Sequence, residues 1–463
     1  MSLNYLLQCT RSLREVLVGN RLFGCALIVL IVLSAGCSKR DVQPTATADQ
    51  QPAADNITAN EPTDGTQDTI VFFKPEGDVQ TAIQEELILA EPGSTIQLEE
   101  GVFEFTAGLS LDVDDVTIRG RGADKTILSF KGQEAGAEGL YVTSDRVLIE
   151  DLAIVDTKGN GMKSHTANDT VVRRVRVEWT GGPKTTNGAY GIYPVNSTNV
   201  LVEDCTAIGA SDAGIYVGQS KNIMIRNCLA KYNVPGIEIE NCYGGEAYNN
   251  TTTNNTGGIL VFDLPDLPMQ RGHDIRVHHN KVFDNNTPNF APKGNIVGTV
   301  AAGTGLMIMA NDNVEVFEND IRDHDTVNCL VISYLLSGLA INDPNYYPYP
   351  ERVHIHHNTF GRGGDKPSGE GGQFMAGVLG APLPDILWDG VMDIEKYRDK
   401  PIDLAQIVCV RDNQKEGGEL TFANLGGAAT LADPSKAEVL RDLSAHTGLL
   451  PAVKPVVIEG VDK

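Results

Sequence analysis

The chain has 463 residues, with 61 acidic residues against 37 lysines and arginines, so its formal net charge is −24. A surface this acidic argues against nucleic acid and anionic lipid surfaces as partners. Hydrophobic residues make up 41% of the sequence, which is enough to build a large buried core.

The N-terminal segment has the features of a bacterial lipoprotein signal. Arginines precede an apolar run at 27–33, which leads into the sequence SAGC at 34–37. Small residues followed by Cys after a short apolar run are typical of export signals in which the Cys becomes lipidated. We therefore predict a signal peptide at 1–36, lipidation of Cys37 and a cell-envelope location, with membrane contact through this lipid anchor only. An ordinary signal peptide or a single membrane helix is the alternative.

 We predict the outer membrane as the site of that anchor.

The next segments lead into a folded domain. Residues 37–66 are rich in Thr, Ala, Gln, Asp and Pro with almost no large apolar residue, which predicts a disordered tether. Asp78 then has the features of a helix N-cap, and the apolar spacing of the residues after it predicts a helix that ends before Pro92. A helix of this kind suits the open end of a stack of strands, where the first strands have no neighbour to cover their edges.

A short sequence unit recurs about every 22 residues along the middle of the chain. It reads GIYPV at 191–195, GIYV at 214–217 and GIEI at 236–239. A second apolar strand follows each unit, namely NVLVEDC at 199–205, NIMIRNC at 222–228 and EAYNN at 246–250. This period is too short for a propeller blade or a helical repeat, and the β-branched, Asn-rich units predict a coil of short parallel strands.

These units, together with AEPGSTIQLEEGVF at 90–103 and DVTIRGRGADKTI at 115–127, resemble right-handed parallel β-helix proteins of the pectate-lyase-like and NosD-like kind. More narrowly, the chain is similar to a family of bacterial β-helix-repeat lipoproteins of unassigned function. The resemblance implies an all-β fold, a right-handed parallel β-helix of about ten to twelve turns with caps at both ends. It implies no single activity, because such folds carry out many reactions.

The resemblance and the spacing together set the expected domain limits. We predict the β-helix at 67–425, with a long loop insertion at 361–405 and a C-terminal cap and tail at 426–463. A short helix at 436–443 is expected within the cap, followed by an extended tail. Shorter loops are expected at 263–274, 284–303 and 333–352.

One column of residues is expected to stack at the turn that ends the second strand of each unit. Its members change along the chain from apolar residues through thiols to asparagines. They are Leu152, Val175, Cys205, Cys228, Asn250, Asn280, Asn319, Asn358 and Asn413. We interpret the asparagines as a structural ladder of amide hydrogen bonds. Cys205 and Cys228 are expected as stacked buried thiols, with a disulfide as the alternative.

A second set of residues is expected on the outer surface of the first strands, because side chains alternate along a strand. One outward column is Tyr141, Lys163, Tyr193, Tyr216, Glu238, Leu260 and Met307, and the other is His165, Val195, Gly218, Glu240, Phe262 and Met309. Neighbouring strands therefore bring Lys, His, Tyr and Glu side chains onto one face. A solvated sheet surface is the plain interpretation of such a face.

The functional interpretation is abstraction of a C5 proton from a uronate sugar. Lys163, His165, Tyr193 and Tyr216 are the predicted catalytic residues, as acid, base or neutraliser of the substrate carboxylate. Glu238, Glu240 and Asp263 are predicted to bind substrate or a cation, with Ca²⁺ as the candidate ion, although no recognised calcium loop is present. The Asp-Pro-His triplet of mannuronan epimerases is missing.

A second group of histidines, at 273–279 and 354–357, is interpreted as surface turn residues and not as a metal site. His278 and His356 are expected two turns of the coil apart with Phe317 between them, too far to share one ion. The sequence thus predicts an exported, lipid-anchored lyase or C5-epimerase acting on a uronate-containing polysaccharide. A non-catalytic scaffold that binds a glycan or a partner protein along the same face is the alternative.

Overall fold

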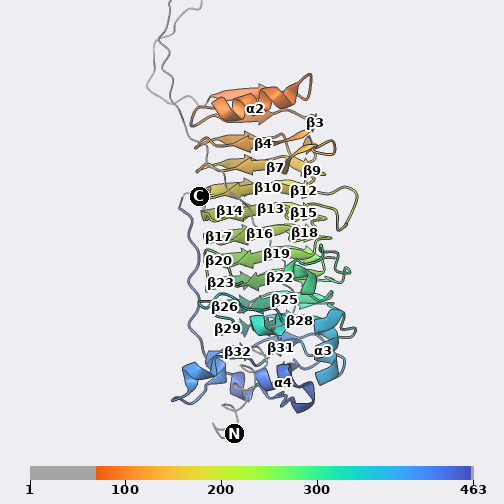
Figure 1. Cartoon of the computed structure of the whole chain (residues 1–463), viewed down its shortest axis with the longest axis vertical. Coiled ribbons are helices and arrows are strands. Elements are labelled where there is room, and N and C mark those ends of the chain that lie inside the picture. Colours follow the sequence, from red (N-terminus) through yellow and green to blue (C-terminus); the bar gives the residue numbers. More distant parts are fainter. Residues whose placement is uncertain (1–68, 460–463) are drawn as a thin grey trace, which may run out of the picture. The chain divides into compact units, whose positions relative to one another are not determined.

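Three parallel sheets wind around a common interior in the computed structural model, which describes residues 69–459 (Figure 1). Each turn of this right-handed coil contributes one strand to sheet C, one to sheet A and one to sheet B, in that chain order. Sheet A has 12 strands, and sheets B and C have 11 each. The predicted fold class, a right-handed parallel β-helix, is confirmed.

Sheet A consists of β1 (Ile70–Phe73), β2 (Thr95–Leu98), β5 (Thr117–Arg119), β8 (Leu148–Glu150), β11 (Thr170–Arg173), β14 (Thr198–Glu203), β17 (Lys221–Arg226), β20 (Tyr243–Tyr248), β23 (His273–His278), β26 (Asp312–Phe317), β29 (Glu351–His356) and β32 (Val408–Arg411). Sheet B consists of β3 (Gly101–Glu104), β6 (Thr126–Ser129), β9 (Ala153–Val155), β12 (Arg176–Glu178), β15 (Thr206–Ile208), β18 (Leu229–Lys231), β21 (Thr251–Thr253), β24 (Lys281–Phe283), β27 (Asp320–Arg322), β30 (Thr359–Phe360) and β33 (Gln414–Lys415). Sheet C consists of β4 (Ala107–Leu111), β7 (Ala135–Val142), β10 (Asn160–His165), β13 (Ile192–Val195), β16 (Ile215–Gly218), β19 (Pro235–Glu240), β22 (Gly257–Phe262), β25 (Thr304–Met309), β28 (Val327–Ile332), β31 (Ile386–Trp388) and β34 (Phe422–Asn424).

The interior is filled by aliphatic side chains stacked from one turn to the next. In sheet C, Ile192 pairs with Ile215, Ile215 with Ile237 and Ile237 with Ile259. All four are fully buried. β-branched residues suit this position because each packs flat against the same residue type in the strands above and below.

The corners between sheets A and B are tight. From β8 onward each contains one residue with a positive φ, such as Asp151, Asn227 or His357. Asn and Asp tolerate this left-handed conformation better than most residues. Long insertions therefore fall at the two edges of sheet C, at 179–191, 263–272, 284–303, 333–350, 361–385 and 389–407. Sheet C is thus the sheet whose outer face is framed by loops.

Both ends of the coil are covered. Helix α2 (Val79–Leu89) begins after Asp78, whose side chain accepts a hydrogen bond from the Thr81 backbone N–H, and it buries Ile83 and Leu87. This confirms the predicted capping helix. The far end is covered by α4 (Ala428–Ala432) and the 3₁₀ turns η5 (Pro434–Lys436) and η6 (Leu443–His446).

Two predictions about the last third of the chain were wrong. No helix forms over 436–443, because Leu440 makes an antiparallel bridge to Asn424 at the end of β34. The segment 361–405 is not a continuous loop, since it contains the sheet C strand β31 as well as α3 (Gly369–Leu379). The remaining 3₁₀ turns in the insertions are η1 (Ile296–Thr299), η2 (Tyr334–Ser337), η3 (Ile394–Tyr397) and η4 (Leu404–Gln406).

The C-terminal tail runs back along the coil over the outer face of sheet A (Figure 1). Val456 and Ile458 are buried against Leu201 and Met224, which lie on β14 and β17. The predicted extended tail is confirmed, and it covers part of the outer face of sheet A.

Cys37 and the segments 1–36 and 37–66 lie outside the described residues, so the lipid anchor and the tether stay predictions. Within residues 69–459, no helix is long and apolar enough to cross a membrane. Cys205 and Cys228 are separate buried thiols with no disulfide between them.

Candidate functional site on sheet C

The strand register places the predicted residues on one face of sheet C. Lys163 on β10 lies opposite Tyr141 on β7 and Tyr193 on β13, and Tyr216 on β16 lies opposite Glu238 on β19. His165 lies opposite Val195. Both outward columns predicted from the repeat are therefore confirmed in their register.

A hydrogen-bonded chain crosses the accessible part of this face. Asn196 Nδ2 lies 3.2 Å from His165 Nε2, and His165 Nδ1 lies 3.3 Å from the Tyr141 hydroxyl. An amide Nδ2 can only donate, so neutral His165 accepts at Nε2 and carries its proton on Nδ1, facing Tyr141. Lys163 Nζ lies 4.9 Å from the centre of the Tyr193 ring. These residues are half-buried.

A buried network adjoins this chain. The Tyr216 hydroxyl donates to Glu240 Oε1 over 2.6 Å, and Gln219 Nε2 donates to the same oxygen over 3.1 Å. The rings of Tyr190, Tyr193 and Tyr216 pack together with centroids 4.4 to 4.9 Å apart. Tyr216 thus links the accessible Tyr193, which its ring contacts, to the buried Glu240, to which its hydroxyl donates.

Carboxyl groups are unusually concentrated here. Asp212 Oδ1, Glu238 Oε2 and Asp263 Oδ2 are buried, and none of them has a hydrogen-bond partner within the described part of the chain. Burial, with the nearby Glu240 adding to it, raises the pKa of Asp212 to about 7. Burial likewise raises the pKa of Asp263 to about 7, and that of Glu238 well above its ordinary value.

The same environment keeps the tyrosines protonated. Burial raises the pKa of Tyr193 to about 12, and the Glu240 and Asp212 carboxyls add to the effect. The pKa of Tyr216 is raised further because this side chain is almost fully buried beside Glu240. Tyr193 is therefore a proton donor at neutral pH and not a base.

The structure separates the predicted site residues into two groups. Lys163, His165 and Tyr193 stay accessible, whereas Tyr216, Glu238, Glu240 and Asp263 are 4%, 1%, 7% and 0% exposed. Residues 284–303 fold over this part of the face, and Asn295 Nδ2 donates to Asp212 Oδ2 over 3.2 Å. The buried residues lie where they were expected, but a polymer in solution does not reach them in this conformation.

Sequence reasoning missed several members of the site. Tyr141 stands in the predicted outward column without a predicted role. Tyr190, Asn196 and Gln219 were not selected at all. They lie in turns beside the strands, so the alternation within strands that identified the columns gave no signal for them. Asn196 has a positive φ. An asparagine just after a strand is the one sequence feature that could have indicated this turn residue.

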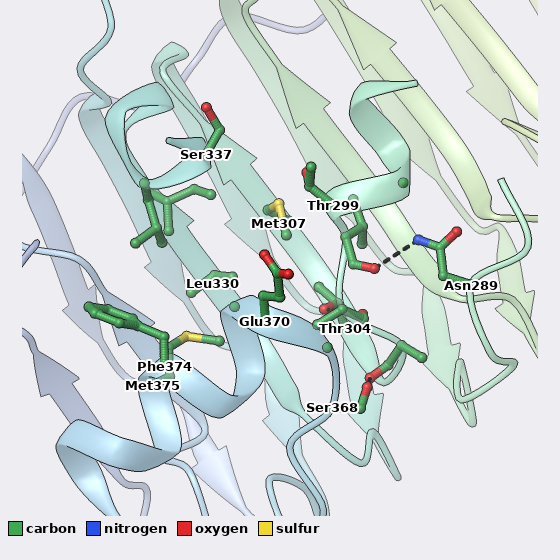
Figure 2. Close-up of a pocket in the computed structure, with 18 of the residues that line it drawn as sticks. Asn289, Thr299, Thr304, Met307, Leu330, Ser337, Ser368, Glu370, Phe374 and Met375 are labelled. Carbon is green, nitrogen blue, oxygen red and sulfur yellow. Dashed lines mark hydrogen bonds between the residues drawn. The ribbon is translucent and has the colours of Figure 1, made fainter. Parts of the chain in front are cut away.

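An apolar pocket of about 920 Å³ continues the face beyond the carboxyl groups. Met307 and Leu330 form its floor, and η1, η2 and the start of α3 surround it (Figure 2). Glu370 on α3 lines it from the opposite side. Val300 from 284–303 also lines the pocket, which confirms that this insertion covers the methionine end of the columns.

The second histidine group lies on sheet A. His278, Phe317 and His356 form a stack, with centroid distances of 4.6 and 5.3 Å, as expected. The interpretation of these histidines as turn residues is wrong for His273, His278, His354 and His356, which lie within β23 and β29, and His354 is also buried, at 3% exposed. Among residues 69–459, only Glu315, His354 and His356 bring three metal-ligating atoms within 4.8 Å of one another.

Comparisons with known proteins give the following similarities. The family described as a right-handed beta helix region matches residues 116–266. The A-module of mannuronan C-5 epimerase AlgE4 from Azotobacter vinelandii is similar over 77% of this chain and 96% of its own, with 16% identity and a TM-score of 0.48. An alginate lyase from Paenibacillus sp. is similar over 76% of this chain and 97% of its own, with 14% identity and a TM-score of 0.38. No curated protein matches.

The two solved structures are distant similarities to a uronate polysaccharide epimerase and a lyase. The fold itself rests on the three parallel sheets and on the family match.

Proposed function

We propose that this protein is a lyase or C5-epimerase that acts on a uronate-containing polysaccharide at the outer face of sheet C. The observation that supports the proposal is the chain from Asn196 through His165 to Tyr141, placed beside Lys163 and Tyr193. It brings a hydrogen-bonded base, a cation and a protonated phenol together on the part of the face that substrate can reach.

The reaction needs three groups of this kind. Lys163 pairs with the uronate carboxylate and stabilises the negative charge that develops when the C5 proton leaves. Tyr141 removes that proton, and the His165 Nδ1–H directed at its oxygen stabilises the phenolate that does so. Tyr193, held protonated, is the acid.

Two outcomes are possible once the C5 proton has been removed. If the C4–O bond breaks, a double bond forms between C4 and C5, and Tyr193 gives its proton to the leaving oxygen. If that bond stays intact, Tyr193 protonates C5 from the opposite face and inverts it. Tyr216 acts as a positioning residue, because its ring contacts Tyr193 edge-on while its hydroxyl is held by Glu240.

The test is turnover of a panel of polyuronates. Ultraviolet absorbance of unsaturated products detects elimination, and deuterium incorporation at C5 in heavy water detects epimerisation. We expect Tyr141→Phe, His165→Gln and Lys163→Gln each to lower kcat/KM by about 10²- to 10⁴-fold. Tyr232→Phe, which changes an exposed tyrosine in the turn between β18 and β19, serves as the matched control.

The proposal fails if no polyuronate shows either signal, with or without Ca²⁺, or if the three variants behave as the wild type. Glycan binding without turnover would favour the alternative, a non-catalytic scaffold that presents Tyr141 and Tyr193 to sugar rings.

A further inference from the structure

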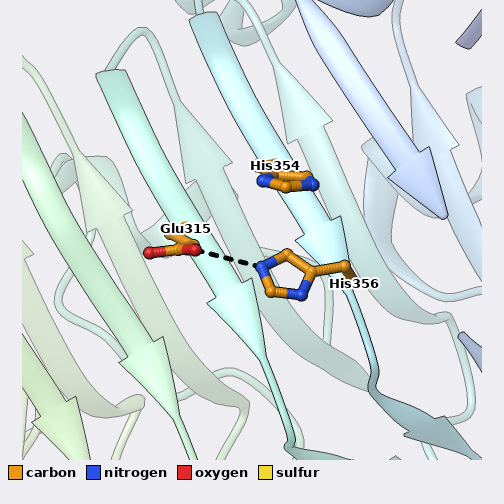
Figure 3. A group of neighbouring side chains, drawn as sticks. All are labelled: Glu315, His354 and His356. Atoms are coloured by element: carbon orange, nitrogen blue, oxygen red, sulfur yellow. Dashed lines mark hydrogen bonds and ion pairs between the residues drawn. The ribbon is translucent and has the colours of Figure 1, made fainter. Parts of the chain in front are cut away.

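Glu315, His354 and His356 form a compact group on the outer face of sheet A, away from sheet C. Glu315 lies on β26 directly opposite His354 on β29. His356 Nε2 lies 3.1 Å from Glu315 Oε1, and the two histidine rings have centroids 4.1 Å apart (Figure 3). A His-x-His pair on one strand points both rings to the same side, where the neighbouring strand supplies the carboxylate.

One nitrogen atom of this group lacks the hydrogen-bond partner that a buried polar atom usually has. His354 Nδ1 is buried and has no hydrogen-bond partner among the described residues. The other nitrogen of the ring, Nε2, accepts from Arg411 Nε over 3.1 Å. A buried polar atom without a partner is costly, and an unsatisfied imidazole nitrogen beside a second histidine and a carboxylate faces the position that a metal ion would take.

We propose that Glu315, His354 and His356 bind a divalent transition-metal ion, with Zn²⁺ as the best fit. Two imidazoles and one carboxylate are a donor set that suits Zn²⁺ and similar ions, and Mg²⁺ or Ca²⁺ would need more oxygen ligands. Ligand bonds of about 2.0–2.2 Å require the three donor atoms to close in slightly from their present spacing.

Metal binding requires a proton to move within each histidine ring. On ligation His354 shifts its proton from Nδ1 to Nε2, and Arg411 turns from that nitrogen toward Asp412, with which it already forms an ion pair of 2.6 Å. His356 binds through Nε2, whose proton now points to Glu315 Oε1, by moving that proton to Nδ1, which lies 2.7 Å from His357 Nδ1. A hydrogen bond of this kind orients a ligating histidine.

Two arginines lie close to this group, but each is paired with a carboxylate, which reduces its repulsion of a bound cation. Arg276, which approaches Glu315 at 3.8 Å, is paired with Glu246. Arg411 is paired with Asp412. Each guanidinium is therefore matched by its own carboxylate, and the charge of Glu315 remains for the ion.

The site also touches the C-terminal tail. The Val453 backbone N–H donates to Glu315 Oε2 over 3.0 Å, which leaves Oε1 free to face the histidines. Val453 is buried at this point. A bound ion would fix the Glu315 carboxylate and so hold the tail on sheet A, which makes the site structural and independent of the reaction proposed for sheet C.

The test is metal binding to the full-length protein after removal of metals with a chelator. Co²⁺ is titrated first, because its visible absorption reports the number and type of ligands, and Zn²⁺ is then titrated against it by calorimetry. We expect one saturable ion per chain, bound without the near-ultraviolet bands of a thiolate ligand. We also expect Zn²⁺ to slow proteolysis of the tail.

The variants identify the ligands. We expect His354→Gln, His356→Gln and Glu315→Gln each to weaken binding at least tenfold, since loss of even an indirect partner costs about that much. His273→Gln, on the neighbouring strand β23, is the matched control and should bind normally. Thermal melts of every variant show whether it is folded. Absence of saturable binding by the folded wild type, or normal binding by folded ligand variants, would overturn the proposal.

Discussion

At the scale of single residues, Gly218 is the position on which the buried network depends most directly. A Cβ atom at Gly218 would lie 2.2 Å from the Tyr216 hydroxyl oxygen, well inside van der Waals contact. Gly218 also pairs with Glu240 in the neighbouring strand. The missing side chain therefore makes the space through which the Tyr216 ring reaches the Glu240 carboxylate.

Replacing Gly218 by Ala should displace Tyr216 and break its hydrogen bond to Glu240. We expect the free energy of unfolding to fall by about 1–3 kcal/mol, as for other overpacked positions. Denaturant titration of Gly218→Ala measures the loss. The matched control is Gly377→Ala in α3, where a Cβ meets nothing within 4 Å and helix propensity should give a gain of up to about 1 kcal/mol. Equal stability of the wild type and Gly218→Ala would contradict this explanation.

At the scale of structural elements, the asparagine ladder holds the corner between sheets A and B. Asn319 Nδ2 donates to the Val277 carbonyl oxygen and to Asn358 Oδ1, both over 2.9 Å. Its own Oδ1 accepts from the Asn280 backbone N–H and side chain. The same pattern repeats along the column, so the structural interpretation of the ladder is confirmed.

Removing one amide from the middle of the ladder should leave buried backbone groups on both sides without partners. We expect Asn319→Ala to lower the free energy of unfolding by roughly 2–4 kcal/mol, from about 1–3 kcal/mol for each such group. Thermal and denaturant unfolding measure the effect. Asn413→Ala, at the half-buried end of the same ladder, should cost clearly less because water reaches it. A similar cost for both variants would argue against the ladder as the cause.

A second ladder at the corner between sheets B and C was not predicted. Asn255 Oδ1 accepts from the Asn233 backbone N–H and side chain, and Asn285 Oδ1 accepts from those of Asn255. These three asparagines have the same spacing as the first ladder, so the repeat contained the signal. The predicted column covers only the corner after the second strand of each unit, and this second ladder lies at another corner.

At the scale of the whole molecule, sheet C changes character along the coil. Its outer face is polar and accessible around Lys163, carries buried carboxyl groups around Glu238, and becomes an apolar pocket at Met307. Insertions at both of its edges produce this gradient by covering one end and leaving the other open (Figure 1). The folded state therefore holds a group of carboxyls whose pKa values are raised by burial.

These carboxyls should make stability depend on pH. Asp212 titrates at about 7 in the folded state and near 4 when unfolded, so between these values the folded state binds more protons. The stability it contributes is fully present below about pH 4 and is lost as the pH rises to about 7. Asp212→Asn cannot ionise, so we expect its free energy of unfolding to rise relative to the wild type with increasing pH.

The expected rise is roughly 2–4 kcal/mol between about pH 4 and about pH 8, measured by denaturant titration at several pH values. The exposed Asp399→Asn is the control, and its difference from the wild type should stay constant. A constant difference for Asp212→Asn as well would show that this carboxyl is not held protonated by burial.

The sequence by itself determined the coil, its register and both outward columns, because these depend on a local unit that repeats and on the alternation of side chains within a strand. It also located the ladder from Asn250 to Asn413 for the same reason. The tertiary structure alone decided which part of the sheet C face is covered, since 284–303 folds over residues from other turns and has no repeat of its own. It likewise decided that the C-terminal tail reaches Glu315, through the hydrogen bond from the Val453 backbone N–H. The ladder register that stacks Asn319 on Asn358 also places Glu315 opposite His354, but no repeat in the sequence positions the tail, because this contact joins residues far apart along the chain.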